Sequence, residues 1–172
     1  MTATTLESKK TALLKKQKVL SIGIIAPITS EELLNALVAA CEFDMPISVL
    51  ASGSEKAQSL CSELSNNFKK FKIFEDLEQN KIKILEESDV IIFSEIPLIE
   101  ELQLLQRYNT IPIAPVGGHI EDFNAQKEEG NGFLYIPGSI WQVVRALVRA
   151  NENYQFSYDW RNLKKSFVEA EF

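Results

Sequence analysis

The stretch VLSIGIIAPITSEELLNALVAA, residues 19–40, contains two hydrophobic patterns in succession. Its first part, Val19–Ala26, is a nearly continuous aliphatic run, which is typical of a strand covered on both faces of a parallel sheet. The second part repeats apolar residues at every fourth position from Leu33, and Thr29 stands three residues before Glu32 in the capping-box pattern that begins a helix. The stretch therefore predicts a strand followed directly by a helix, the first half of a βαβ unit.

The same alternation continues along the rest of the chain, without an internal repeat or a low-complexity linker. Further apolar runs predict five more strands, at Ile47–Ala51, Phe71–Phe74, Val90–Phe93, Ile111–Pro115 and Gly132–Ile136. Amphipathic segments predict helices at Glu31–Phe43, Glu55–Asn66, Leu77–Glu87, Leu98–Tyr108 and Tyr158–Ala170, and a further helix after Ser139, where Ser139 and Gln142 repeat the capping pattern. Since crossovers between parallel strands are right-handed, we predict an α/β fold. It is a single doubly wound Rossmann-like domain with a six-stranded parallel sheet in the order 3-2-1-4-5-6.

Composition sets bounds on size and partners. The chain has 172 residues, which suits one domain, and 45% apolar with 24% charged residues is enough to form a packed core. The net charge of −6 argues against nucleic acid or an anionic membrane as a partner. Residues 1–18 hold five lysines against the single acidic residue Glu7, so we expect a basic arm there, followed by one acidic domain over residues 19–172. A targeting role for this arm is the less favoured alternative, because no signal-peptide cleavage pattern follows the lysines.

The two cysteines, Cys41 and Cys61, fall in predicted helices and not at a metal-ligand spacing. We therefore expect buried, reduced thiols, with no disulfide and no zinc site. No run of apolar residues is long enough to span a membrane. The sequence predicts a cytoplasmic protein, with the plastid stroma left open, and no cofactor.

Ligands of a doubly wound sheet bind beyond the carboxyl ends of the strands, at the point where the strand order reverses. Here that point lies between the first and fourth predicted strands. Four loops reach this edge of the sheet, namely Pro27–Ser30, Ser52–Ser54, Ser94–Pro97 and Val116–His119.

Spaced blocks in the second half of the chain carry a family resemblance. They are Arg107-Tyr108-Asn109-Thr110-Ile111-Pro112-Ile113, Val116-Gly117-Gly118-His119, Gly130-Asn131-Gly132-Phe133-Leu134, Ala146-Leu147 and Trp160-Arg161 with Leu163. In this order and at this spacing they resemble the carboxy-terminal domain of bacterial glycogen synthases and plant starch synthases, and the upstream stretch Val49–Ser54 is similar to another block of that family. The resemblance covers roughly residues 19–172. It implies the second Rossmann-like domain of a two-domain GT-B glycosyltransferase, an enzyme that moves glucose from ADP- or UDP-glucose onto an α-1,4-glucan without a metal.

Residues that the family uses for chemistry are replaced in this chain. Family members carry an arginine and a lysine that hold the nucleotide diphosphate after the first strand, whereas this chain has Glu31 and Glu32 there. Carboxylates repel a diphosphate instead of neutralising it. The two glutamates of the family's E-x7-E element correspond to Ile96 and Leu104. The sequence therefore predicts no catalytic residue and no metal ligand.

Candidate binding residues remain at the carboxyl ends of the strands. Gly117 and Gly118 match the family's glycine loop, although a glycine turn that fixes the exit of the strand is the favoured explanation. The sole histidine, His119, is favoured as a surface or half-buried residue over a catalytic base. The full set of candidate ligand-binding residues is Thr29, Ser30, Ser52, Gly53, Glu95, Gly117, Gly118 and His119.

Three functions are compatible with these observations. The favoured one is a non-catalytic, stand-alone relative of the glycogen/starch synthase second domain, a pseudoenzyme that binds a partner protein, a glucan or a nucleotide-like ligand. The second is a subunit of a split glycosyltransferase that binds nucleotide sugar and acts with a separate chain. The third is a flavodoxin-like signalling or small-molecule module, with a cation near Ser94-Glu95 and Glu31-Glu32. Apolar residues at the strand ends, Ile28, Ile96, Leu98 and Ile99, predict self-association or a protein partner across this edge, unless they fold inward and fill it.

Overall fold

The first βαβ unit forms as its sequence predicts. A computed structural model describes residues 18–172, and in it strand β1 (Ile22–Ile24) leads through a short loop into helix α2 (Glu31–Glu42). All three residues of β1 are buried, because the strand is covered on both faces. The predicted basic arm lies outside the described residues except for Lys18.

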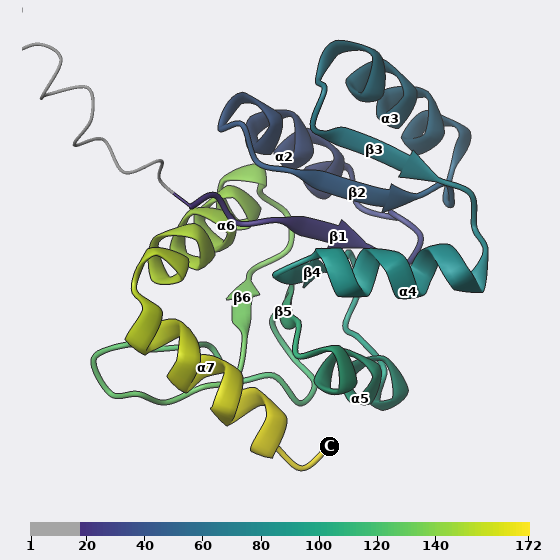
Figure 1. Ribbon diagram of the computed structural model, residues 1–172. Helices are drawn as coiled ribbons and strands as arrows, with labels where there is room; N and C mark the ends of the chain where they lie inside the picture. The colour runs from purple at the N-terminus through teal and green to yellow at the C-terminus, as the bar shows by residue number, and fades with distance from the viewer. Residues whose placement is uncertain (1–17) are drawn as a thin grey trace, which may run out of the picture.

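Strands and helices alternate as far as the fifth strand, after which the sixth strand follows without a helix and two helices end the chain (Figure 1). The strands are β2 (Ile47–Leu50), β3 (Phe71–Phe74), β4 (Val90–Ile92), β5 (Ile111–Pro115) and β6 (Phe133–Tyr135). The helices are α3 (Glu55–Asn67), α4 (Glu78–Glu87), α5 (Ile99–Tyr108), α6 (Ile140–Gln155) and α7 (Ser157–Glu169). The observed helix bounds lie within one residue of the predicted ones, whereas β1 is shorter than Val19–Ala26 because its ladder partners pair over three residues only.

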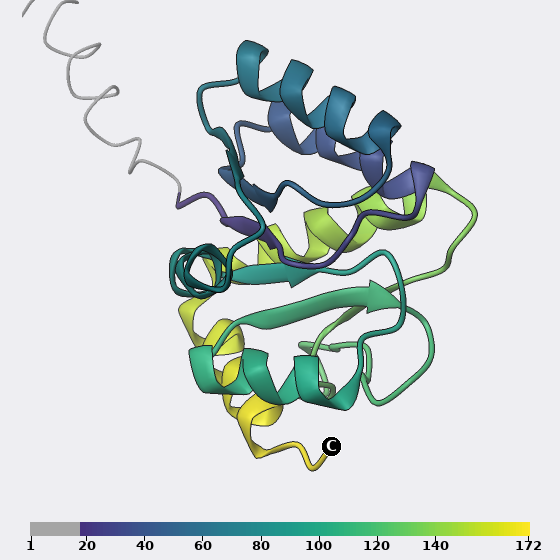
Figure 2. The same ribbon diagram turned by 90° about the vertical axis from the view of Figure 1, so that its right-hand side faces the viewer.

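All strand pairs are parallel, and their order in the sheet is β3-β2-β1-β4-β5-β6. The predicted α/β fold and strand order are thereby confirmed. Helices α2, α3 and α6 pack on one face of the sheet and α4 and α5 on the other, as the edge-on view in Figure 2 shows. Helix α7 extends from α6 to α5 and contacts both.

Two helix starts differ in detail from the predicted capping boxes. The N-cap of α2 is Ser30 and not Thr29, since the Ser30 hydroxyl accepts a hydrogen bond from Leu33 N at 3.1 Å. Ser139 does lie at the N-cap of α6, but its side chain makes no capping hydrogen bond there. Neighbouring hydroxyl residues compete for a cap, so the pattern alone fixes a helix start only to within a residue.

The cysteines behave as expected from the sequence. Cys41 and Cys61 are buried on α2 and α3, and both are free thiols. Burial raises the pKa of Cys41 to about 11 and also raises the pKa of Cys61, because desolvation penalises the thiolate. No helix among residues 18–172 is long and apolar enough to cross a membrane.

Candidate functional site

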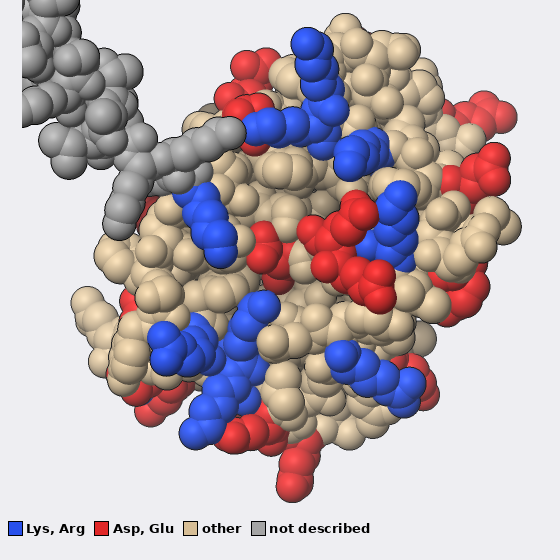
Figure 3. Space-filling view, viewed as in Figure 1, with Lys and Arg blue, Asp and Glu red and all other residues tan. Residues whose placement is uncertain are grey.

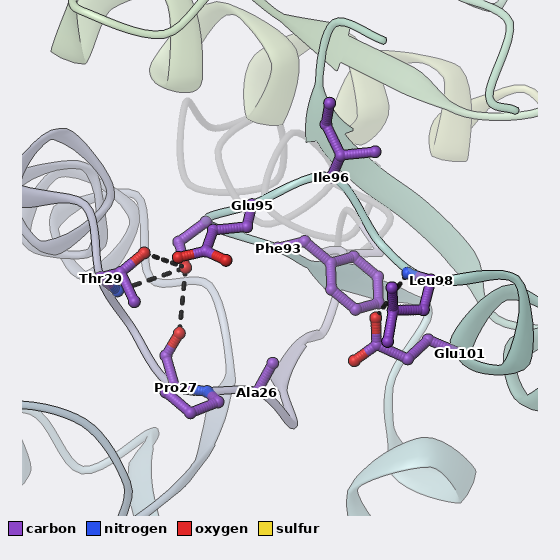
Figure 4. A pocket seen from close by; sticks show the side chains of 9 residues that line it. Ala26, Pro27, Thr29, Phe93, Glu95, Ile96, Leu98 and Glu101 are labelled. Carbon is purple, nitrogen blue, oxygen red and sulfur yellow. Dashed lines mark hydrogen bonds between the residues drawn. The ribbon is translucent and has the colours of Figure 1, made fainter. Parts of the chain in front are cut away.

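A cleft of about 260 Å³ opens where the strand order reverses, between the loops that follow β1 and β4. We call it the switch-point cleft, and Figure 4 shows its walls. Its lining residues are Ala26, Pro27, Thr29, Phe93, Ser94, Glu95, Ile96, Leu98 and Glu101. The cleft lies at the place that the sheet topology predicts for a ligand, and two of the candidate residues, Thr29 and Glu95, line it.

The Ser94 hydroxyl joins the two loops of this cleft. It accepts hydrogen bonds from Thr29 N at 3.2 Å and Thr29 Oγ1 at 3.1 Å, and it donates to Pro27 O at 3.0 Å. A hydroxyl has one proton and two lone pairs, so these three bonds use its whole capacity. The central polar group of the cleft therefore has no hydrogen bond left for a ligand.

The charged residues of the cleft are acidic. Glu95 is exposed, and the Glu101 carboxylate accepts a hydrogen bond from Leu98 N at 2.8 Å, which occupies a free amide at the start of α5. None of the nine lining residues is a lysine, arginine or histidine. Lys56, on the neighbouring helix α3, forms an ion pair with Glu31. The arrangement offers negative charge and apolar surface, which suits neither a phosphate nor a diphosphate.

The glycine loop after β5 is in contact with an isoleucine. A Cβ atom placed on Gly117 or Gly118 would lie 2.8 Å from Ile96 Cδ1 or 2.7 Å from Ile96 Cγ2. Both glycines also have positive φ angles, of 122° and 68°. The positive φ angles favour glycine at both positions, and the Ile96 side chain lies next to this backbone. The space that would let a ligand approach this loop is partly filled.

The other predicted residues lie apart from this cleft. Ser30 caps α2 and donates to Glu32 at 2.9 Å, and hydrogen bonds from the backbone and from Ser30 lower the pKa of Glu32. Ser52 lines a smaller cavity of about 120 Å³ at the end of β2. Gly53, with φ of 107°, pairs through a single parallel bridge with Ile28. Ser30 and Gly53 thus support local structure around the loops.

His119 lies in a second cleft, of about 380 Å³, between the loop that follows β5 and the end of α7. Its ring meets Phe172 edge-on, with ring centroids 6.5 Å apart. The sequence placed His119 at the same edge as Gly117 and Gly118, and the structure separates it from the switch-point cleft. The residues that share its cleft come from its own loop and from α7 and its end, and no spacing pattern in the sequence links the α7 residues to His119.

Apolar side chains gather along the carboxyl edge of the sheet, which we define by the ends of β4, β5 and β6. Ile96 is 49% exposed and Leu98 is 66% exposed. The exposed side chains of Ile99, Val116, Ile136 and Trp141 extend the same edge. Ile28, which the sequence also placed on this edge, is buried, because it turns under the loop to pair with Gly53.

The charges of the molecule are mixed in sign. On the face seen in Figure 3, basic and acidic side chains alternate without a continuous basic surface. Within residues 18–172 no group of three or more acidic, histidine or cysteine side chains is arranged to hold a metal ion. This finding gives no support to a cation held between Ser94-Glu95 and Glu31-Glu32.

No family model matches the chain, but solved structures share its fold. A glycosyltransferase from Rickettsia africae ESF-5 matches with a TM-score of 0.62 and 16% identity, over 99% of this chain and 47% of that one. Sucrose-phosphate synthase from Thermosynechococcus elongatus matches with a TM-score of 0.59 and 12% identity, over 95% of this chain and 44% of that one. WaaG, a glycosyltransferase involved in lipopolysaccharide biosynthesis, matches with a TM-score of 0.58 and 11% identity, over 99% of this chain and 48% of that one. The chain spans about half the length of each, and it has the fold of one half of the GT-B glycosyltransferases.

Proposed function

We propose that this chain is a relative of the glycogen and starch synthase second domain that works by binding and not by glucosyl transfer. The observation that carries the proposal is the lining of the switch-point cleft, where carboxylates and aliphatic side chains stand and no cation does. The saturated hydroxyl of Ser94 and the Ile96 side chain over the glycine loop support the same conclusion.

The negative charge of the carboxylates that line this cleft argues against a nucleotide diphosphate as its ligand. A carboxylate about 4 Å from a phosphate charge costs about 4 kcal/mol at an effective dielectric of about 20, which weakens binding about a thousandfold. Glu95 and Glu101 both line the cleft, and the ion pair with Glu31 engages Lys56. Nothing in the lining offsets that repulsion.

The favoured partner is a protein with an apolar surface, bound across the carboxyl edge. Ile96 and Leu98 are exposed beside a cleft whose Ser94 hydroxyl is fully bonded, and Trp141 is 74% exposed at the start of α6. A row of large apolar side chains at one edge is typical of a contact surface. The chain covers about half of each solved structure that it matches. Since the GT-B family that it resembles has two Rossmann-like domains, we propose a domain of that kind as the partner for this edge.

Two measurements on the purified chain test the catalytic half of the proposal. We expect no glucose transfer from ADP- or UDP-glucose to glycogen, and no thermal stabilisation by ADP, UDP or their glucose conjugates, because a bound ligand would raise the unfolding temperature by mass action. Transfer by this chain alone would refute the proposal. Transfer that needs a second chain would support the split-glycosyltransferase alternative instead.

Light scattering and partner capture test the binding half. Ile99→Glu places a charge on the carboxyl edge, and Phe43→Glu places the same charge on an exposed site at the end of α2 as a control. We expect Ile99→Glu to reduce association with a second copy or with an added partner domain, whereas Phe43→Glu leaves it unchanged. If the two variants associated equally well, the carboxyl edge would not be the contact surface.

A further inference from the structure

Strand β3 is the outermost strand at one end of the sheet, where it pairs with β2 alone (Figure 1). The Lys70 carbonyl accepts a hydrogen bond from Ile47 N at 3.0 Å. The Phe74 carbonyl accepts one from Ala51 N at 2.7 Å, so both carbonyls face the β2 side. Alternate residues of a strand turn their backbone groups to opposite sides, so the N–H and C=O of Ile73 point away from β2. In the part of the chain that the structure describes, neither group bonds to another element, and the sheet therefore ends in an open strand.

The β3 edge, which we define as Phe71–Phe74 with the lysines around it, is basic. Lys69 precedes the strand, Lys72 lies on it and Lys83 comes from α4, and all three are exposed. None of them takes part in an ion pair with a residue that the structure describes. In Figure 3 basic side chains lie over the part of the molecule where Figure 1 places β3. Since the whole chain carries a net charge of −6, this edge is a local exception.

Two of these lysines lie on the same face of the sheet. Lys72 and Phe74 are two residues apart in the strand, so their side chains point to one face. The Lys83 Nζ lies 5.2 Å from the centre of the Phe74 ring and therefore belongs to that face as well. A strand added beside β3 would turn every second side chain to this face, with the nearest one about 5 Å from Lys72.

Charge restricts which strand can pair with this edge. Lysines on an open strand oppose pairing with other chains, because a like charge directly opposite is repelled. A second copy of β3 is unsuitable for this reason, since it brings its own lysines. A strand with acidic residues at alternate positions changes the repulsion into attraction. Glu75 and Asp76 follow β3, so the acidic residues of such a strand must lie beside the start and middle of β3 and not beside its end.

We propose that the β3 edge binds an extended acidic segment of a partner protein, which adds to the sheet beside β3. The N–H and C=O of Ile73 bond to the backbone of that segment, and Lys72 and Lys83 bind carboxylates at its alternate positions. In this mode of recognition the backbone bonds supply affinity and the side chains supply specificity. The β3 edge lies at the opposite end of the sheet from β6, and the proposal does not depend on the function proposed for the switch-point cleft.

A titration of the full chain with capped, fluorescently labelled octapeptides tests the proposal. The probe alternates glutamate and threonine, because threonine favours the extended conformation. Two control peptides replace every glutamate by lysine or by serine. We expect saturable binding of the glutamate peptide by fluorescence anisotropy, at least about tenfold weaker binding of the serine peptide, and none of the lysine peptide. Absence of binding by the glutamate peptide, or equal binding of the glutamate and serine peptides, would refute the proposal.

Hydrogen exchange distinguishes strand addition from simple attraction between charges. The Ile73 amide faces away from β2, so it should exchange rapidly in the free protein and at least about tenfold more slowly when the glutamate peptide is bound. Binding that leaves the exchange of the Ile73 amide unchanged would show that the peptide is held by charge alone, and it would overturn the proposal.

Two variants locate the site. Lys72→Glu replaces an attraction by a repulsion and should weaken binding of the glutamate peptide about tenfold. Lys127→Glu makes the same change at an exposed lysine of the loop between β5 and β6, and it should bind like the native chain. Ile73→Pro removes the outward N–H, which an edge strand tolerates, and should abolish binding. Equal affinity of the two glutamate variants would contradict the proposal even if Ile73→Pro did not fold.

Discussion

The switch-point cleft and the cleft that contains His119 differ in how their polar groups are bonded. In the switch-point cleft the Ser94 hydroxyl is bonded to the Thr29 hydroxyl and to the backbone of Pro27 and Thr29, and its charged residues are Glu95 and Glu101. In the second cleft, between the loop that follows β5 and the end of α7, Glu121 has no ion-pair partner among the described residues. The difference teaches that a hydroxyl bonded within the protein, as Ser94 is, adds a polar residue to a cleft without adding hydrogen-bonding capacity for a ligand.

The largest effect is expected at Gly130, which lines the cleft that contains His119. Gly130→Ala would place a Cβ atom 2.5 Å from Asp122 O at a φ of 95°, so strain and overlap with backbone combine. We expect the free energy of unfolding to fall by about 3 kcal/mol, as measured by denaturant titration. The control is Gly138→Ala, which has a φ of 96° but nothing within 4 Å, and it should lose only about 1 kcal/mol. Equal losses in the two variants would show that close packing at Gly130 does not hold the cleft.

The second effect concerns the floor of the switch-point cleft. The buried Tyr135 hydroxyl donates to Phe93 O at 2.7 Å, and Tyr135→Phe leaves that carbonyl without its partner. We expect a loss of about 1–2 kcal/mol in the free energy of unfolding at neutral pH.

This difference should depend on pH. Burial raises the pKa of Tyr135 above its ordinary value, so the neutral side chain stabilises the folded state at every pH below about 10. As the pH rises above about 10, the unfolded chain loses the tyrosine proton first, and the native protein loses stability relative to Tyr135→Phe. The stability advantage of the native protein over Tyr135→Phe should therefore shrink at alkaline pH. Denaturant titrations of both proteins at neutral and alkaline pH measure this change. A difference that does not change with pH would contradict the stated role of burial.

A smaller effect is expected at the centre of the same cleft. Ser94→Ala removes the hydroxyl that joins Pro27 and Thr29, and because the site is partly open to water we expect a loss of about 1 kcal/mol. Ser52→Ala, on the neighbouring loop, is the matched control, because the Ser52 hydroxyl has no hydrogen bond among the described residues. It should stay within about 0.5 kcal/mol of the native chain in thermal unfolding. A Ser94 variant as stable as the control would mean that the hydroxyl network does not hold the loops.

The smallest expected effect is a gain in stability instead of a loss. Leu98 is exposed at the N-cap of α5 and makes no side-chain capping bond, so Leu98→Asn supplies a capping side chain and should add about 0.5 kcal/mol to the free energy of unfolding. Leu98→Ala removes the same apolar surface without a cap and should add nothing. Both variants should weaken association across the carboxyl edge, which light scattering measures. Normal association of both would argue that Leu98 takes no part in the contact.

Most of the fold can be predicted from the sequence, because it depends on local periodicity. The aliphatic run before Pro27 and the four-residue spacing from Leu33 predict a strand and a helix without any knowledge of their neighbours. The capping pattern predicts Thr29 as the N-cap of α2, whereas Ser30 occupies that position. The pattern does not tell which of two adjacent hydroxyls turns toward the helix. The length of β1 depends on its partner strands, which the local pattern does not contain.

The sequence predicts where the candidate site lies, but not how its residues are bonded and packed. The topology located the switch-point cleft near Thr29 and Glu95, but the saturation of Ser94 depends on bonds to residues 65 and 67 positions away. The burial of Ile28 and the packing of Ile96 over Gly117 are likewise tertiary contacts. The place of Asn131 beside His119 gave no signal in the sequence either, because it depends on how the loop after β5 packs against α7.

The central position of β1 has a consequence for how the chain folds. In the sheet Ile22 lies opposite Ile47 on one side and opposite Val90 on the other. During synthesis from the amino terminus, β1, β2 and β3 can pair early, while the second edge of β1 stays unpaired until β4 emerges from the ribosome. Such long-range closure slows folding, and an open edge attracts other strands. The interval between the synthesis of β3 and that of β4 is therefore the time at which a nascent chain of this kind most needs a chaperone.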